Sequence, residues 1–253
     1  MKKILLSGKD ICKIFDGSSE HELVLNKVNV DIYEGDFTII MGASGAGKST
    51  LLYALSGMDK MSGGKVYYKE QEISNYNEKQ MATLRSQDFG FVFQQTHLVS
   101  NLTLFENVVV AGYLNKKKSA KEVQTRAEEL LQQMNVETAK NRIPSQVSGG
   151  EAQRAAMARA MIHEPGLIFA DEPTGALNKR NSDEILHLLT SLNESGQSIL
   201  MVTHDLRAAL RGNRILYLED GQIIDEMIFS KYVEDEEKGR ESKITEWLTS
   251  MQW

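Results

Sequence analysis

One short segment, 42-GASGAGKST-50, restricts the fold of this chain more than any other, because of the residues on either side of it. The five residues before it, FTIIM, form an apolar run typical of strands that are buried on both faces. The residues after it, 48-KSTLLYALSG-57, have the composition of a helix that ends on a glycine. The sequence therefore predicts a buried strand, a glycine-rich turn and a helix in direct succession, as in α/β folds.

The same segment matches the phosphate-binding pattern G-x-x-x-x-G-K-[ST] in full. Glycines let backbone N–H groups turn inward around phosphates, and the helix that follows adds unpaired N–H groups and its positive dipole end. Lys48 would meet the β- and γ-phosphates, and the Ser49 hydroxyl would bind Mg²⁺. The predicted site consists of Gly42, Ala43, Ser44, Gly45, Ala46, Gly47, Lys48, Ser49 and Thr50. The alternative is a glycine turn without a ligand, and the flanking strand and helix argue against it.

Two adjacent carboxylates follow a second apolar run, in 167-LIFADEPTG-175. A strand at this position delivers Asp171 and Glu172 at its carboxyl end, where ligands bind in open α/β sheets. Asp171 is expected to hold Mg²⁺ through water, since this ion keeps several waters. Glu172 is placed to polarise an attacking water molecule. The alternative, two ordinary acidic residues of a loop, does not explain why they follow a buried strand at once.

Composition excludes several classes of function. The net charge of -6 leaves no global basic field, so we expect no nucleic-acid partner. Cys12 is the only cysteine, which rules out an internal disulfide and fits a reducing compartment. The apolar run Ile4 to Leu6 is too short for the core of a signal peptide, and no stretch approaches the roughly 18 apolar residues of a membrane span. We expect any membrane role to act through a partner.

Strand and helix patterns alternate along the rest of the chain. Two strands are predicted within residues 23–40, around a turn at Glu34 and Gly35, and a hairpin over 214–224 with its turn at Asp220 and Gly221. Further strands are predicted at GGKVYY, FGFVF, LIFA and SILMV, and helices over 48–57, 78–85, 104–112, 119–134 and 181–192, in the alanine-rich part of 147–162 and near 205–210. This order predicts an α/β fold whose core sheet is largely parallel.

A third segment, 148-SGGEAQR-154, places glycines before a helix and forms a second anion-binding N-terminus. One chain has little use for two such sites unless they face each other across a dimer. At this point the chain resembles the ATP-binding cassette (ABC) family. VSGGE resembles its signature motif, and DEPTGAL resembles its Walker B segment and D-loop. The resemblance covers roughly residues 3–225.

Three single residues match the family in its usual order. Phe15 stands where an aromatic side chain stacks on adenine, Gln94 matches the Q-loop glutamine, and His204 matches the switch histidine. Taken alone, Phe15 is a core aromatic, Gln94 a surface glutamine and His204 a neighbour of a helix N-cap. The family context favours the functional interpretation of each.

The resemblance implies a fold and a mechanism. The fold is a P-loop NTPase core with a mixed, largely parallel sheet, an N-terminal antiparallel β subdomain and an inserted helical subdomain over about 95–165. Two copies pair head to tail, and ATP lies between the phosphate loop of one copy and the signature of the other. Glu172 acts as general base, His204 contacts the γ-phosphate, and Gln94 joins Ser49 and Asp171 around Mg²⁺. The signature contributes Ser148, Gly149, Gly150 and Glu151.

The partner implied by the resemblance is a membrane permease at the cytoplasmic face of the cell membrane. GASGAGKSTLL, GFVFQ, NLTLFENV and FADEPTGAL resemble most closely the lipoprotein-release and macrolide-export branch, which includes antimicrobial-peptide resistance exporters. A cytosolic ABC ATPase, such as one for iron–sulfur assembly, is the alternative. A nucleotide-binding module that does not hydrolyse ATP is a second alternative, and Glu172 and His204 argue against it.

Two residues depart from the family pattern. Glu151 stands where the family usually has glutamine, and Asn178 stands where its D-loop usually ends in aspartate. Asparagine keeps a hydrogen-bond acceptor but loses the charge, so Asn178 is expected to affect the coupling between the two ATP sites.

The domain prediction assigns residues 1–228 to the ATPase domain and 229–253 to a C-terminal extension. In the extension, Ile244, Trp247, Leu248 and Met251 follow helical spacing on one face. This face either packs on its own domain or contacts a partner, and a frayed tail is the remaining alternative. The lysine run 116-KKK-118 is interpreted as a solvated loop, with contact to a membrane surface as the alternative.

Overall fold

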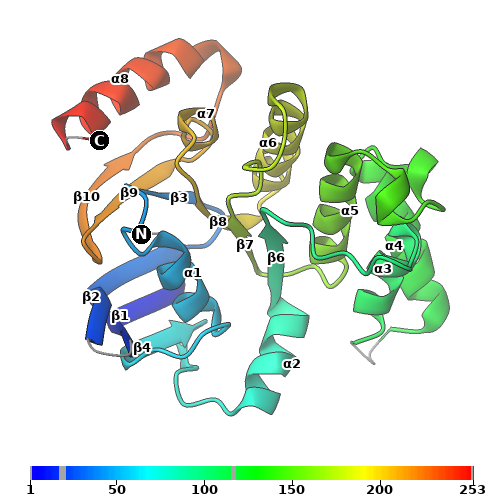
Figure 1. Ribbon diagram of the computed structural model, residues 1–253, viewed down its shortest axis with the longest axis horizontal. Helices are drawn as coiled ribbons and strands as arrows, with labels where there is room; N and C mark the ends of the chain where they lie inside the picture. Colours follow the sequence, from blue (N-terminus) through cyan, green and yellow to red (C-terminus); the bar gives the residue numbers. More distant parts are fainter. Residues whose placement is uncertain (1, 17–20, 115–117, 252) are drawn as a thin grey trace. The chain divides into compact units, whose positions relative to one another are not determined.

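The computed structural model describes residues 2–16, 21–114, 118–251 and 253, and Figure 1 shows its helices and strands. The chain forms two compact units, one from Met1–Met81 with Leu192–Trp253 and one from Ala82–Ser191. The first unit contains β1 (Ile4–Asp16), β2 (His21–Tyr33), β3 (Phe37–Met41), α1 (Lys48–Ser56), β4 (Gly63–Tyr68), β5 (Gln71–Glu72), β8 (Ser198–Val202), α7 (Leu206–Ala209), β9 (Arg214–Glu219), β10 (Gln222–Ile228) and α8 (Glu237–Ser250).

The second unit carries the helices expected between the core strands. It contains β6 (Phe89–Phe93), α3 (Leu104–Gly112), α4 (Ala120–Gln133), α5 (Gly149–Met161) and β7 (Leu167–Asp171). Two helices, α2 (Glu78–Asp88) and α6 (Lys179–Glu194), run across the boundary between the units. Short 3₁₀ turns lie at Glu137–Ala139, Pro144–Gln146 and Glu234–Glu236.

An antiparallel sheet with the strand order β2-β1-β4-β5 forms one half of the first unit. The sequence patterns did not predict its strand β1. The pairing of β1 with β2 shifts register four times, for example between Gly8 and Ile11, and each shift interrupts the alternation of apolar and polar residues. A strand with this many irregularities loses the period of two by which strands are recognised.

Parallel pairing builds the other sheet of the first unit. β3 pairs in parallel with β8 and with β9, and β10 returns antiparallel to β9 after the predicted turn at Asp220 and Gly221. All five residues of β3 and all five of β8 are buried, as expected for strands covered on both faces. The two strands predicted around Gly35 are present as β2 and β3, but their pairing partners lie in different sheets.

The second unit combines the parallel pair β6 and β7 with three helices that contact one another, α3, α4 and α5. Each helix begins with a capping box, in which the residue before the helix and a glutamate in its first turn satisfy each other's backbone N–H groups. Their facing residues form a core that includes Val108, Ala127, Leu130, Ala155 and Ala158, each fully buried. The predicted α/β class is confirmed.

Two further expectations concern membranes. Among the helices of the described residues, none combines the length and apolar character that a membrane span requires. Residues 116 and 117 of the lysine run lie outside the described residues. Lys118, the third lysine of the run, forms an ion pair with Glu164 at 3.1 Å.

Candidate functional site

The phosphate loop lies between the end of β3 at Met41 and the start of α1 at Lys48. Gly42, Gly45 and Gly47 have φ angles of 152°, 84° and 97°, which residues with a side chain adopt at a cost. A Cβ atom at Gly42 would lie 2.0 Å from the carbonyl oxygen of Leu218. Glycine is therefore required at the start of the loop both for its conformation and for its close contact with β9.

The loop has the donor set that a polyphosphate needs. Helix α1 begins after Gly47, which has no side chain to cap the first turn, and helix starts of this kind bind anions through their backbone N–H groups. The Lys48 ammonium donates hydrogen bonds to the carbonyl oxygens of Gly42 and Ala43, both at 2.8 Å. The positive charge is thus held at the loop itself, and the residues present fit the phosphates of ATP.

His204 follows β8, which pairs with β3 in the same parallel sheet. Ile40 of β3 pairs with Val202 of β8, and the N–H of Thr203 donates to the Ile40 carbonyl oxygen at 3.2 Å. Because both strands end at the same edge, the phosphate loop and the exposed His204 follow neighbouring strand ends. The two motifs, more than 150 residues apart in the sequence, are brought together as the α/β topology requires.

Phe15 extends from the antiparallel sheet of the same unit, and its side chain is 44% exposed. The ammonium of Lys13 lies 4.7 Å from the centre of its ring. In the ladder between β1 and β2, Phe15 pairs with Glu22, and the carbonyl oxygen of Val24, two residues further on, would lie 3.0 Å from a Cβ atom at Gly47. Phe15 thus carries an exposed ring on a strand whose partner strand β2 approaches the phosphate loop, and this fits the predicted adenine contact. Its exposure excludes an interior core position for Phe15.

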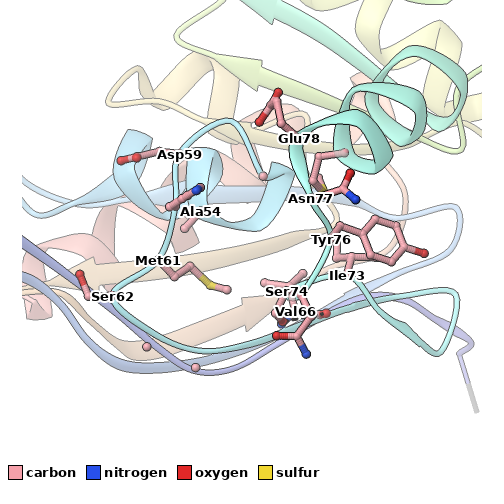
Figure 2. A pocket seen from close by; sticks show the side chains of 16 residues that line it. Ala54, Asp59, Met61, Ser62, Val66, Ile73, Ser74, Tyr76, Asn77 and Glu78 are labelled. Atoms are coloured by element: carbon pink, nitrogen blue, oxygen red, sulfur yellow. Dashed lines mark hydrogen bonds between the residues drawn. The ribbon is translucent and has the colours of Figure 1, made fainter.

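A pocket of about 360 Å³ lies in the first unit, and Figure 2 shows the side chains that line it. It lies between the end of α1, the strand β4 and the start of α2. Labelled lining residues include Asp59, Met61, Tyr76, Asn77 and Glu78. None of the residues predicted for the phosphate site lines it, so the pocket does not mark the nucleotide site.

The predicted acidic residues lie in the second unit, at the end of β7. Asp171 is the last residue of β7 and pairs with Phe93, the last residue of β6, so Gln94 follows the neighbouring strand end. Glu172 adopts a positive φ of 47°, and its carbonyl oxygen accepts from the N–H of Gly175 at 3.0 Å. A Cβ atom at Gly175 would lie 3.0 Å from Nε2 of Gln94, so the glutamine side chain lies directly against this turn.

Sequence reasoning missed one residue of this unit, Gln153 of α5. Its side chain is 1% exposed, and its Nε2 donates to the carbonyl oxygens of Phe93 at 2.8 Å and Pro173 at 2.9 Å. One amide thereby connects the residue before Gln94 with the residue after Glu172. The available signal was a glutamine on a helix face made otherwise of alanine and methionine.

The signature segment caps α5 with both of its polar residues. The Ser148 hydroxyl accepts from the N–H of Glu151 at 3.2 Å and donates to the Glu151 carboxylate at 2.7 Å. The same carboxylate accepts from the N–H of Ser148 at 2.8 Å. These two bonds from Ser148 hold the pKa of Glu151 below its usual range. Glu151 therefore adds a negative charge beside the exposed Ser148 hydroxyl.

Asn178 has an analogous role at the start of α6. Its side-chain oxygen accepts from the N–H of Asn181 at 3.0 Å, as an N-cap residue does. The side chain of Asn181 also lies close to the signature, since a Cβ atom at Gly150 would be 2.7 Å from its Cγ. The two residues that depart from the family pattern therefore both cap helices whose N-termini lie together.

Mg²⁺ was predicted to bind Ser49, Asp171 and Gln94. Ser49 lies half-buried in the first turn of α1, and Asp171 is half-buried at the end of β7. Within the described residues, no group of three or more His, Cys, Asp or Glu side chains could hold a metal ion. A hydroxyl, an amide and a single carboxylate suit Mg²⁺, which takes its other oxygens from phosphates and water.

Comparisons with known proteins identify the family and the fold. A family model described as ABC transporter matches residues 25–175. A dimeric structure described as a post-hydrolysis state of the ATP-binding cassette MJ0796 bound to ADP and Pi is 37% identical, with a TM-score of 0.83, over 90% of this chain and 100% of that one. A second dimeric structure, of MJ0796 described as a bacterial ABC transporter cassette, has the same values. The structure of cbiO1 from Clostridium perfringens, part of the ABC transporter complex cbiONQ, is 26% identical, with a TM-score of 0.80, over 96% of this chain and 93% of that one.

Proposed function

This chain belongs to the ABC transporter family and is an ATPase of that family, and we propose that two copies of it pair head to tail to drive a membrane permease. The observation that carries the proposal is that two helices of one chain begin in glycine-containing segments of the kind that bind anions. The phosphate loop opens α1, and the exposed Ser148 and Gly149 open α5. Two copies in head-to-tail order would place one start on each side of the γ-phosphate. The matched structures of MJ0796 are dimers, which supports this arrangement.

Within each ATP site, we assign the residues as follows. Phe15 stacks on adenine, Lys48 and the loop N–H groups bind the phosphates, and Ser148 with Gly150 of the second copy completes the γ-phosphate site. Glu172 accepts the proton of the attacking water, and His204 contacts the γ-phosphate. Mg²⁺ held near Ser49, Asp171 and Gln94 would neutralise charge on the phosphates.

We propose that the permease exports a lipophilic, peptide or lipoprotein substrate, as in the lipoprotein-release, macrolide-export and antimicrobial-peptide resistance branch. The chain would then lie at the cytoplasmic face of the cell membrane, bound to the permease. The residues of the segments GASGAGKSTLL, GFVFQ, NLTLFENV and FADEPTGAL support this branch. Export of a macrolide or an antimicrobial peptide would give a role in antibiotic resistance. The comparisons do not favour the iron–sulfur assembly alternative, because the matched cassettes are described as parts of transporters.

The decisive experiment replaces the proposed general base. We expect Glu172→Gln to bind ATP with the affinity of the unchanged protein, to lose hydrolysis and to accumulate as an ATP-bound dimer in size-exclusion chromatography. Lys48→Ala is the matched control, because it should lose ATP binding and stay monomeric. A Glu172→Gln protein that hydrolyses ATP at the original rate, or a monomer that does so, would contradict the proposal.

The permease partner needs a separate test. Affinity purification of the tagged chain from detergent-solubilised membranes of its source should recover an integral-membrane protein in ATP-dependent amounts. Recovery of iron–sulfur assembly proteins in its place would favour the alternative.

A further inference from the structure

The C-terminal helix α8 is fastened to the segment after His204 by one buried arginine. Arg240 is 3% exposed. One of its terminal nitrogens donates to the carbonyl oxygen of Gly212, and the other donates to that of Ser230 at 3.2 Å. Its guanidinium carbon lies 4.7 Å from the ring centre of Phe229 and 5.6 Å from that of Tyr232. A planar guanidinium is suited to this combination of a two-pronged donor and aromatic faces, and an ammonium is not.

The carbonyl of Gly212 belongs to the end of the segment that His204 begins. After His204, the four-residue helix α7 runs to Ala209, and its last turn closes with a bond from the N–H of Gly212 to the Ala209 carbonyl oxygen at 3.1 Å. A helix of one turn does not hold its own position in water and depends on tertiary contacts. The contacts at its two ends, together with its buried Ala208 and Ala209, therefore help to hold the segment that begins at His204.

Both ends of this segment are anchored on β3 by backbone hydrogen bonds. At the start, Thr203 is bonded to Ile40, and its hydroxyl accepts from the N–H of Asp205 at 3.0 Å. At the other end, the N–H of Asn213 donates to the Phe37 carbonyl oxygen at 3.0 Å. Arg240 holds the residue immediately before Asn213, so α8 is part of the second anchor.

The rest of α8 packs within the same unit through buried side chains and one further side-chain hydrogen bond. Ile244 and Leu248 are 0% and 1% exposed, and α8 contacts α7. The indole N–H of Trp247 donates to the Asp225 carboxylate at 2.9 Å, which connects α8 to β10. The helical face expected from the sequence is thus used within its own unit.

We propose that Arg240 is a positioning residue for ATP hydrolysis, because it holds the end of α7 in place through Gly212 and so sets the position of His204. The inference rests on the proposed role of His204 at the γ-phosphate. The C-terminal helix then acts on the rate of hydrolysis as well as on stability. A small displacement of a group that contacts the reacting phosphate lowers the rate strongly, since reacting groups must be aligned.

The test compares Arg240→Met with Lys243→Met. Both changes remove one positive charge from α8, but Lys243 is exposed and Arg240 is buried. Steady-state ATPase rates are measured well below the melting temperature of each variant. We expect Arg240→Met to lower kcat by about tenfold with KM for ATP within about twofold of the original, and Lys243→Met to change neither. Hydrogen exchange of the amides in 206–212 should accelerate in Arg240→Met alone.

Arg240→Lys keeps the charge and tests the proposal if the methionine variant folds poorly. It should retain an intermediate kcat, because one ammonium cannot reproduce both carbonyl bonds and the stacking. A purely structural role predicts a lower melting temperature with an unchanged kcat, and that result in either variant would overturn the inference.

A double mutant tests whether Arg240 affects hydrolysis through His204. If Arg240 acts through His204, adding Arg240→Met to His204→Ala should lower kcat no further than His204→Ala alone. Additive losses would overturn the inference while leaving the proposed function intact. If His204→Ala itself leaves kcat unchanged, the proposed role of His204 fails, and the route through it fails as well.

Discussion

The amide of Gln153 is predicted to hold the acidic turn and the Q-loop residue in place, and Gln153→Leu tests this. Leucine nearly preserves the volume of the side chain but leaves the carbonyl oxygens of Phe93 and Pro173 without their 2.8 Å and 2.9 Å bonds. An unsatisfied buried acceptor costs about 1–3 kcal/mol. The bond to Pro173 is buried and the one to Phe93 is part-buried, so the second loss is smaller. We expect the free energy of unfolding to fall by about 2–4 kcal/mol.

Urea unfolding measures this loss, and Gln133→Leu provides the control. Gln133 is an exposed residue of α4, so the same chemical change there should alter the free energy of unfolding by less than about 0.5 kcal/mol. We also expect kcat of Gln153→Leu to fall, because the two carbonyl oxygens flank Gln94 and Glu172 in the sequence. A loss below about 0.5 kcal/mol, or a fully active variant, would refute the reasoning from these bonds.

Three shorter predictions concern the phosphate loop, adenine and the signature. Gly42→Ala should abolish ATP binding, since its Cβ atom would lie 2.0 Å from the Leu218 carbonyl oxygen; isothermal titration calorimetry checks this, and measurable affinity would contradict it. Phe15→Ala should raise the Kd for ATP about tenfold through lost stacking while Leu23→Ala, at a neighbouring exposed residue, should not. Ser148 lowers the pKa of Glu151, so the ionised cap stabilises at neutral pH and is lost as pH falls through that lowered pKa. Glu151→Gln should therefore reduce the fall in urea midpoint that we expect between about pH 7 and pH 3, and an unchanged pH profile would count against the cap.

An element of this fold could be predicted from the sequence where its own residues carry a regular pattern, and not where it depends on pairing with distant strands. β3, α1, β8 and the hairpin of β9 and β10 were predicted because each has an uninterrupted apolar run or a turn with glycine at the required position. β1 was missed because its register shifts disturb the alternation, and its pairing with β2 and β4 supplies bonds that no local pattern shows.

The same distinction applies to the site. The phosphate loop and the acidic pair are contiguous motifs, so their residues could be named from the sequence. Gln153 and Arg240 act through carbonyl oxygens 60 and 28 residues away, and such contacts leave no mark on the local sequence. The function of a buried polar side chain is set by the fold around it, because an amide or a guanidinium must find partners wherever the chain places it.

The two departures from the family pattern gain a common explanation from their positions. The family usually has glutamine and aspartate where this chain has Glu151 and Asn178, so one negative charge is absent from the D-loop and one is added at the signature. Both residues still serve as helix-capping acceptors, so the exchange moves charge and keeps the geometry. The side chain of Asn181 lies against Gly150, and its backbone N–H donates to the Asn178 side chain. Glu151 and Asn178 therefore lie at neighbouring helix starts.

If a single negative charge at either helix start serves the same purpose, the effects of substituting Glu151 and Asn178 on the ATPase rate should depend on each other. Glu151→Gln alone removes the negative charge from both positions, and Asn178→Asp alone places one at each, so each single variant should change the ATPase rate and its cooperativity. The double variant restores one charge and should lie closer to the original protein than the two single effects predict. Neighbouring residues couple by about 0.5–3 kcal/mol, so we expect a deviation from additivity of at least about twofold in kcat/KM. Strictly additive rates would show that the two positions do not sense each other's charge, and an Asn178→Asp variant with unchanged rate and cooperativity would show that the D-loop charge does not affect hydrolysis.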